Sequence, residues 1–171
     1  GNLKNPTTDV IDFNEQILNC LLQHNSGFLS SKDKHDNTAL MQVVFYQHIK
    51  GMEWLVERGV SLSLKNKDGN TALILSVLNQ NNDISKSLIE KMAIAEIESR
   101  NNDGDTALIL ASRQGNKKLI EVLLEAGADT KIKDKNQLSL AEILKKHGHE
   151  NLIDFLNEKR KLVKYARFEE N

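Results

Sequence analysis

The chain has 171 residues, of which 39% are hydrophobic and 27% are charged. This length and apolar content suffice for one folded domain and leave no room for a second sizeable one. The 23 basic and 24 acidic residues are interspersed and give a net charge of -1, which argues against electrostatic capture of nucleic acid or of an anionic membrane. No apolar run approaches the roughly 20 residues of a membrane-spanning helix. Cys20 is the only cysteine, so we expect no internal disulfide and favour a reducing cytoplasm.

A short pattern recurs along the chain. It reads DNTAL at residues 36–40, GNTAL at 69–73, GDTAL at 104–108 and, in degraded form, QLSLA at 137–141. The intervals between Thr38, Thr71, Thr106 and Ser139 are 33, 35 and 33 residues. Self-similarity at this period indicates a stacked array of structural repeats.

Each repeat is predicted to contain two helices. The hydroxyl residue can accept hydrogen bonds from the free N–H groups of a helix start, so a helix is expected directly after it. In the third unit this helix has a buried stripe at Leu108, Ile109 and Ala111, and a second apolar stripe follows at residues 119–124. A two-helix unit is too small to bury its own apolar face, so its stability must come from the units stacked on either side.

Residues 104–129, which read GDTALILASRQGNKKLIEVLLEAGAD, resemble an ankyrin repeat. The resemblance implies an all-α solenoid of about four full repeats plus a partial N-terminal repeat, each full repeat having two antiparallel helices and a protruding hairpin loop. We expect a capping partial repeat at residues 1–32, full repeats at 33–65, 66–100, 101–133 and 134–160, and a C-terminal helical extension or tail at 161–171.

Two segments depart from the regular repeat. Residues 90–98 add two residues and lack the glycine that ends the second helix elsewhere, as Gly59 and Gly127 do, so we expect a prolonged helix or a bulged loop. The stretch at 158–168 is basic with interspersed apolar residues. It is expected to continue the last helix and then fray, pack over the end of the array, or dock on a partner.

The residues that invite a chemical interpretation do not form a complete site. His147 and His149 have a spacing that could ligate a metal, but no third ligand has recognisable spacing. Residues 101–105 resemble the start of a calcium loop, yet the two defining acidic positions hold Ser99 and Leu110. Cys20 has the spacing of a buried apolar residue. We therefore expect no metal, no cofactor and no enzyme activity.

The resemblance also implies a partner-binding surface, because ankyrin arrays most often contact partners through their loop tips and the exposed turns of the inner helices. Carried over by position, the candidate residues are Phe45, Tyr46, Leu78, Asn79, Arg113 and Gln114 on the helices and Lys34, His35, Lys67 and Asp105 at the tips. Phe45 and Tyr46 are expected to form its centre, since exposed aromatic clusters tend to be contact sites. Alternatively, Phe45 folds inward to compensate for Gly51. Trp54 has a regular core position and is expected to be buried.

These observations predict a monomeric, non-catalytic module that binds a protein partner through the concave face of the stack. Two alternatives remain. The chain, which begins Gly1-Asn2, could be the targeting fragment of a larger protein. The heavy use of lysine and asparagine hints at an AT-rich genome, and such a protein could be a secreted bacterial effector acting in a host cytoplasm. The other alternative is a purely structural spacer.

Overall fold

The structure, a computed structural model, describes the backbone of residues 29–169 and the side chains of residues 29–161. The helices are α2 (Ala39–Phe45), α3 (Ile49–Glu57), α4 (Ala72–Leu78), α5 (Asn82–Ile89), α6 (Ile94–Ile97), α7 (Ala107–Arg113), α8 (Lys117–Glu125), α9 (Leu140–Lys146), the 3-10 helix η2 (Glu150–Leu152) and α10 (Ile153–Glu169). None of them is long and apolar enough to cross a membrane. The expected partial repeat and Cys20 lie outside the described residues, apart from residues 29–32.

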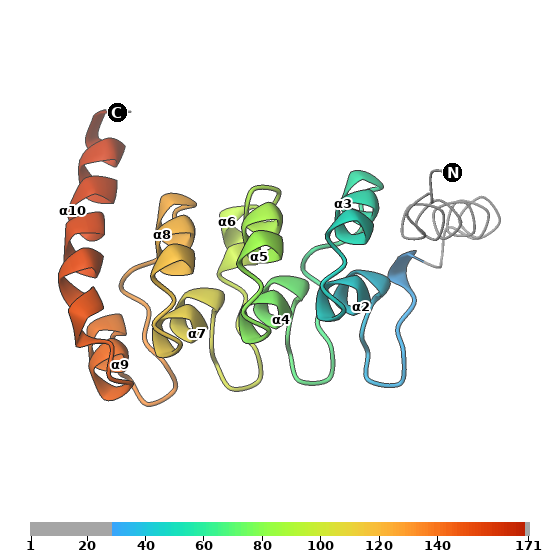
Figure 1. The fold of residues 1–171 in the computed structure, drawn as a ribbon, viewed down its shortest axis with the longest axis horizontal. Coiled ribbons are helices and arrows are strands. Elements are labelled where there is room, and N and C mark those ends of the chain that lie inside the picture. The colour runs from blue at the N-terminus through green and yellow to red at the C-terminus, as the bar shows by residue number, and fades with distance from the viewer. Residues whose placement is uncertain (1–28, 170–171) are drawn as a thin grey trace, which may run out of the picture.

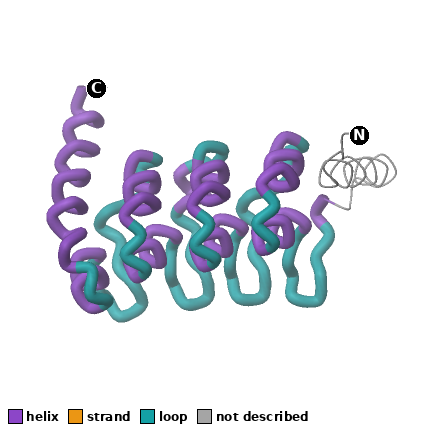
Figure 2. The backbone as a smooth tube through the Cα atoms, viewed as in Figure 1, coloured by secondary structure: helices purple, strands orange, loops and turns teal. Residues whose placement is uncertain are grey.

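The helices stack in two parallel rows (Figure 1). One row contains α2, α4, α7 and α9, and the other contains α3, α5, α8 and α10, with each helix packed against its neighbours in both directions. The long loops all project on the same side of the stack (Figure 2). Within residues 29–169 the only β-type pairings are two isolated bridges, Lys32 with Thr38 and Lys133 with Ser139. The predicted all-α solenoid is confirmed.

The hydrophobic core runs continuously between the two rows. Its most deeply buried members include Val44, Ile84, Leu108, Ile120 and Leu123. Burying such an aliphatic side chain is worth about 1.5–3 kcal/mol relative to leaving it exposed. Because each unit buries its stripe against the next, the core belongs to the array and not to any single repeat.

The helix starts follow the predicted capping chemistry. Thr38, Thr71 and Thr106 each accept a hydrogen bond from a backbone N–H three residues later, at 3.3 Å. Ser139 does the same for Glu142, whose carboxylate in turn accepts from the Ser139 N–H at 2.8 Å. The first helix of each unit therefore begins where the repeated hydroxyl residue places it.

The second helices begin at caps that the sequence reasoning did not identify. His48 Nδ1, Asn81 Oδ1 and Asn116 Oδ1 accept from the N–H groups of Gly51, Ile84 and Leu119, respectively. These three caps occupy one position of the repeat. The asparagine that recurs at positions 81 and 116 could have predicted two of these helix starts from the sequence, since asparagine is among the best N-cap residues.

Hydrogen bonds between equivalent positions tie successive loops together. Lys32 Nζ donates to the Lys65 carbonyl, Lys65 Nζ to the Arg100 carbonyl, and Arg100 to the Lys133 carbonyl, at 3.0, 2.7 and 3.1 Å. At the loop tips the Asn102 N–H donates to the Asp68 carbonyl at 3.0 Å, and Gly69 allows this close approach. Its φ is +74°, and a Cβ there would meet the backbone nitrogen of Asn102 at 2.7 Å.

Residues 90–98 and the C-terminal stretch, which depart from the regular repeat, both form helices. The prolonged-helix interpretation of residues 90–98 is wrong: α5 ends at Ile89 and the short helix α6 follows separately. With no glycine to reverse the chain, the insertion forms a helical turn that buries Ile97. At the C-terminus the helix does continue, as α10, and Lys159 bonds to Glu121 and Glu125 of α8 at 2.5 and 3.0 Å.

Candidate functional site

An exposed aromatic pair lies at the end of α2. Phe45 and Tyr46 are 58% and 74% exposed, and their rings contact edge to face with centroids 5.3 Å apart. Tyr46 is the C-cap of α2 and Gln47 turns the chain with a φ of +57°, so the helix ends here and both side chains point outward. Leu78, at the equivalent end of α4, is 43% exposed, and Ile49 is 39% exposed.

The alternative in which Phe45 fills the space beside Gly51 is wrong. A Cβ added to Gly51 would lie 2.6 Å from His48 Nδ1 and 3.3 Å from Val43. The His48 ring occupies this space because its nitrogen caps α3 at Gly51. Phe45 is therefore left on the surface, where α2 ends.

Asn79 and Gln114 occupy the C-caps of α4 and α7, in line with Tyr46. Both are partly buried. Gln114 reaches across to the preceding unit, where its Nε2 donates to the Val77 carbonyl at 2.9 Å, and its Oε1 is buried without a partner within the described residues. Gln114 therefore links two repeats, while Asn79 makes no side-chain hydrogen bond in the described part of the chain and remains available.

Arg113 ends α7 at the position that Phe45 and Leu78 occupy in the earlier units, but its guanidinium is turned into the stack. It bonds to Asp105 and, at 3.3 Å, to Asp134 of the next unit. The Arg113 side chain is 25% exposed and both carboxylates are 3% exposed. The Arg113 guanidinium thus joins two repeats, while a quarter of its side chain stays exposed.

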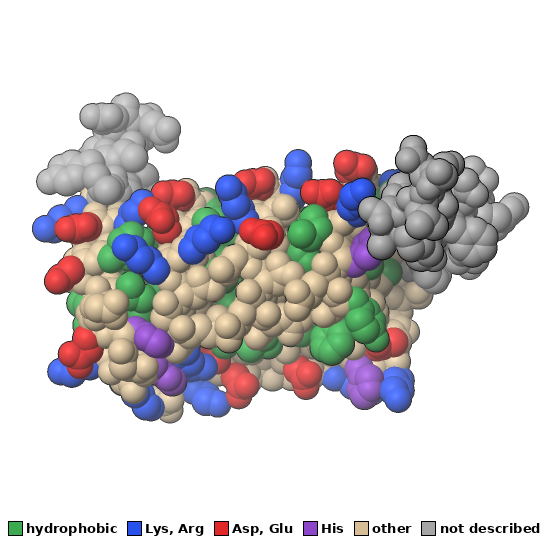
Figure 3. Space-filling model, in the orientation of Figure 1, with side chains coloured by type: hydrophobic (Ala, Val, Ile, Leu, Met, Phe, Trp, Pro, Cys, Tyr) green, Lys and Arg blue, Asp and Glu red, His purple; other side chains and the backbone are tan. Residues whose placement is uncertain are grey.

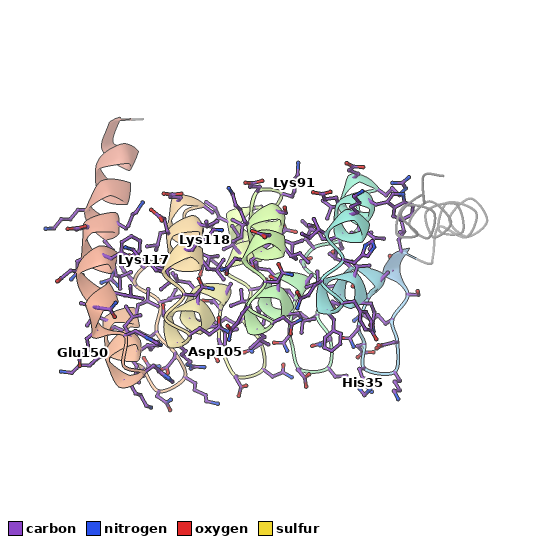
Figure 4. All side chains as sticks on the ribbon, in the orientation of Figure 1. His35, Lys91, Asp105, Lys117, Lys118 and Glu150 are labelled. Carbon is purple, nitrogen blue, oxygen red and sulfur yellow. The ribbon has the colours of Figure 1, made fainter. Side chains whose placement is uncertain are left out.

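The expectation that Asp105 is an exposed tip residue is wrong. Asp105 is buried, and the exposed tip residues of its loop are Asn102 and Asp103, of which Asp103 pairs with Lys135 at 2.9 Å. The physical reason is the hairpin closure: Asn101 Oδ1 accepts from the N–H groups of both Asp103 and Asp105 and pulls residue 105 under the turn. Figure 4 shows Asp105 near the base of the stack, beneath α7.

Comparison of the three junctions explains why Arg113 turns inward. At the first two, the contact is between amides: Asn66 Nδ2 donates to Asn37 Oδ1, and Asn101 Nδ2 donates to Asn70 Oδ1, at 2.9 and 3.1 Å. At the third, Asp105 and Asp134 occupy the same two positions. Two buried carboxylates need a cation, and Arg113 is the cation that reaches both.

The pKa of Asp134 reflects this environment. Burial raises the pKa, but the N–H groups of Leu138 and Asn136 and the Arg113 guanidinium lower it by more, so the pKa lies below its ordinary value. Asp134 is therefore charged at neutral pH and holds Arg113 in place.

The remaining loop-tip candidates are exposed. Lys34, His35 and Lys67 lie at the tips of the first two loops, and the His35 carbonyl accepts from the Lys67 N–H at 3.1 Å. Figure 4 shows His35 at the lower edge of the stack. The structure thus brings Lys34, His35 and Lys67 to one rim, with Phe45 and Tyr46 on the neighbouring helix ends.

The other candidates of the sequence analysis have structural roles. His149 Nε2 donates to the Arg113 carbonyl at 3.1 Å, and its ring lies so close to Gly115 that a Cβ there would approach it to 2.4 Å. Among the described residues no group of histidine, cysteine, aspartate and glutamate side chains could hold a metal ion. Trp54 is buried as predicted, with the Arg58 guanidinium 3.7 Å from its ring centroid.

Each described unit has a pair of helices, a hairpin loop and a first helix that begins at a threonine or serine cap. A comparison with protein families agrees with this architecture. Residues 59–134 match the family model described as ankyrin repeats, in three copies. This segment is an array of ankyrin repeats. None of the curated proteins is a significant match to the chain. Ankyrin repeats are generally non-catalytic protein–protein interaction modules, and no catalytic domain is found.

Proposed function

We propose that this ankyrin repeat array binds a protein partner through one face, made of Phe45, Tyr46, Leu78, Asn79, Arg113 and Gln114 with Lys34, His35 and Lys67 at its rim. We refer to these residues as the binding face. The observation that carries the proposal is the aromatic pair at the end of α2, since the rings are exposed although they lie beside a continuous core. Exposed apolar groups ringed by polar residues are typical of contact sites.

The aromatic pair can supply a useful part of the binding free energy. Covering on the order of 100 Å² of each ring is worth about 2.5 kcal/mol per ring at about 25 cal/mol per Å², before the entropic cost of association. The rim lysines contribute less to affinity because their charges stay solvated and screened. They should affect the association rate and its salt dependence instead.

The array is proposed to act in the cytoplasm as a monomer. The support for the location is that Cys20 is the only cysteine in the chain, so the fold uses no internal disulfide. The support for the monomer is that each unit buries its apolar stripe against the next unit of the same chain.

The test uses a partner isolated by affinity capture with the wild-type protein. The partner's affinity is then measured for Phe45→Ala and Tyr46→Ala, each shown to keep the wild-type melting temperature. Each substitution is expected to weaken binding by about tenfold or more, because about 1.4 kcal/mol corresponds to tenfold.

Ile94→Ala is the matched control, since Ile94 is 54% exposed on α6, outside the binding face. It should bind normally. Unchanged affinity in both aromatic variants would move the binding site elsewhere on the array.

A further inference from the structure

The turns between the paired helices form a strip without formal charge. The three-residue turns of the first three described units, YQH at 46–48, NQN at 79–81 and QGN at 114–116, contain no aspartate, glutamate, lysine or arginine. The helix residues that flank the turn are also uncharged in the first two units, whereas the third unit has Arg113 and Lys117 at these positions. We call the uncharged residues 45–49, 78–82 and 114–116 the neutral strip. Figure 3 shows hydrophobic side chains gathered over the α2 end of this face and a band of uncharged groups running from there across the stack.

Charged residues of both signs border the neutral strip. Lys50, Asp83 and Lys117 lie in the first turns of α3, α5 and α8, on one side of the strip, and all three are exposed. Figure 4 shows Lys117 and Lys118 at α8. On the loop side the tips carry Lys67 and Asp68. The rims therefore select no single sign of charge, and a partner segment centred on the strip meets an electrically neutral surface.

The strip also offers unused amide groups. His48, Asn81 and Asn116 use their side-chain acceptors to cap helices. Gln47 and Gln80, by contrast, are exposed, and Asn79 is partly buried. None of these three makes a side-chain hydrogen bond within the described residues. A primary amide presents a donor and an acceptor together, so it can pair with a peptide group or with another uncharged polar group.

Burial of an unpaired charge against such a surface is unfavourable, because neither the apolar rings nor the neutral amides supply a counterion. Arg113, beside the strip, does not change this, since Asp105 and Asp134 already hold its guanidinium.

We propose that the neutral strip recognises an uncharged polypeptide segment of the partner, which seats an apolar side chain on Phe45 and Tyr46 and pairs polar groups with Gln47, Asn79 and Gln80. This inference rests on the proposed function and specifies the chemistry of the partner. The contact made on the strip itself is then governed by burial of apolar surface and by neutral hydrogen bonds, and it is nearly independent of salt. The rim lysines add a salt dependence only for a whole partner whose charges reach them.

The experiment pans a displayed library of random linear peptides on the protein and measures the affinities of the recovered peptides in solution. The peptides are expected to carry aromatic or aliphatic residues and to lack charged residues in their shared core. Their dissociation constants should change by less than about twofold between about 0.05 and about 0.5 M salt.

Charge insertion tests the same point on the protein side. Gln80→Glu and Gln80→Lys should both weaken binding by about tenfold, because either sign is left without a partner. The matched controls are Ala95→Glu and Ala95→Lys, since Ala95 is exposed on α6, outside the neutral strip. The controls should bind as the wild type does, and all variants are compared at equal melting temperature.

The possible failures are distinguishable. Peptides that are rich in one sign of charge, lose affinity steeply with salt and still depend on Tyr46 would overturn the inference while leaving the proposed function in place. A gain in affinity for one of the two Gln80 variants would do the same. If no recovered peptide loses affinity on Tyr46→Ala, both the binding face and the inference are wrong.

Discussion

At the scale of single residues, Arg113 has a structural role at a repeat position that is exposed in the other units. Its position ends an inner helix and is exposed in the first two described units, where it holds Phe45 and Leu78. In the third unit it neutralises Asp105 and Asp134, which are buried between repeats. The energetic importance of Arg113 lies in what its removal would leave behind, namely two buried and unpaired carboxylates.

Arg113→Ala is therefore expected to destabilise the protein by about 3 kcal/mol or more, the range for breaking a buried ion pair. Combining it with Asp105→Asn and Asp134→Asn should restore most of the loss, because these two substitutions recreate the amide contact that Asn70 and Asn101 make one junction earlier. Urea denaturation measures both effects. A triple variant as unstable as Arg113→Ala would show that the arginine acts through packing and not through charge.

At the scale of elements, α8 shows how the repeat depends on its neighbours. Its apolar stripe, Leu119, Ile120, Leu123 and Leu124, is fully buried, while the opposite face carries Lys118 and Glu121. The helix packs on α7 within its unit, on α5 in the preceding unit and on α10 in the following one. Truncating a side chain of this stripe should therefore weaken the packing within three units and lower the stability of the array.

Leu123→Ala is expected to cost about 2–5 kcal/mol, because it removes a fully buried side chain and leaves a cavity in a packed core. The exposed truncation Ile94→Ala should stay within about 0.5 kcal/mol of the wild type. Thermal and chemical denaturation provide the comparison. If Leu123→Ala unfolds like the wild type, its assignment to the core is wrong.

The hairpin loops allow a second test at this scale. Gln137 turns its loop with a φ of +63°, where the equivalent positions are Gly69 and Gly104. A side chain in this region costs about 1–2 kcal/mol, and glycine costs about 0.5–1 kcal/mol in chain entropy. Gln137→Gly is therefore expected to stabilise the protein by about 0.5 kcal/mol.

Gly104→Ala is the reverse experiment. A Cβ there would meet only Lys135, at 3.8 Å, so the expected loss of stability comes from the backbone conformation alone. Denaturation curves in which Gln137→Gly lowers the stability would mean that the glutamine side chain contributes more than the strain costs.

At the scale of the whole molecule, the described units are held together by a continuous core and by hydrogen bonds between equivalent loop positions. Removal of divalent metal with EDTA is expected to leave the melting temperature unchanged. A clear fall, reversed by adding back zinc or calcium, would show that a metal supports the stack.

Much of this architecture follows from the sequence alone. The period of the DNTAL-like pattern, the hydroxyl caps and the apolar stripes predicted two helices per unit and a stack of units, because helix starts and amphipathic faces depend on residues three or four apart. The exposed aromatic pair at 45 and 46 was also anticipated from its place in the repeat, although its role in binding remains a proposal.

Only the tertiary structure decided which side chains are free to act. Asp105 reads as a loop-tip residue, yet it is buried because Asn101 closes the turn over it and because Arg113 and Asp134 complete its environment. Phe45 is exposed because the His48 ring already occupies the space beside Gly51. Contacts between repeats join residues about thirty apart and depend on side-chain direction, so a pattern of local spacing cannot specify them.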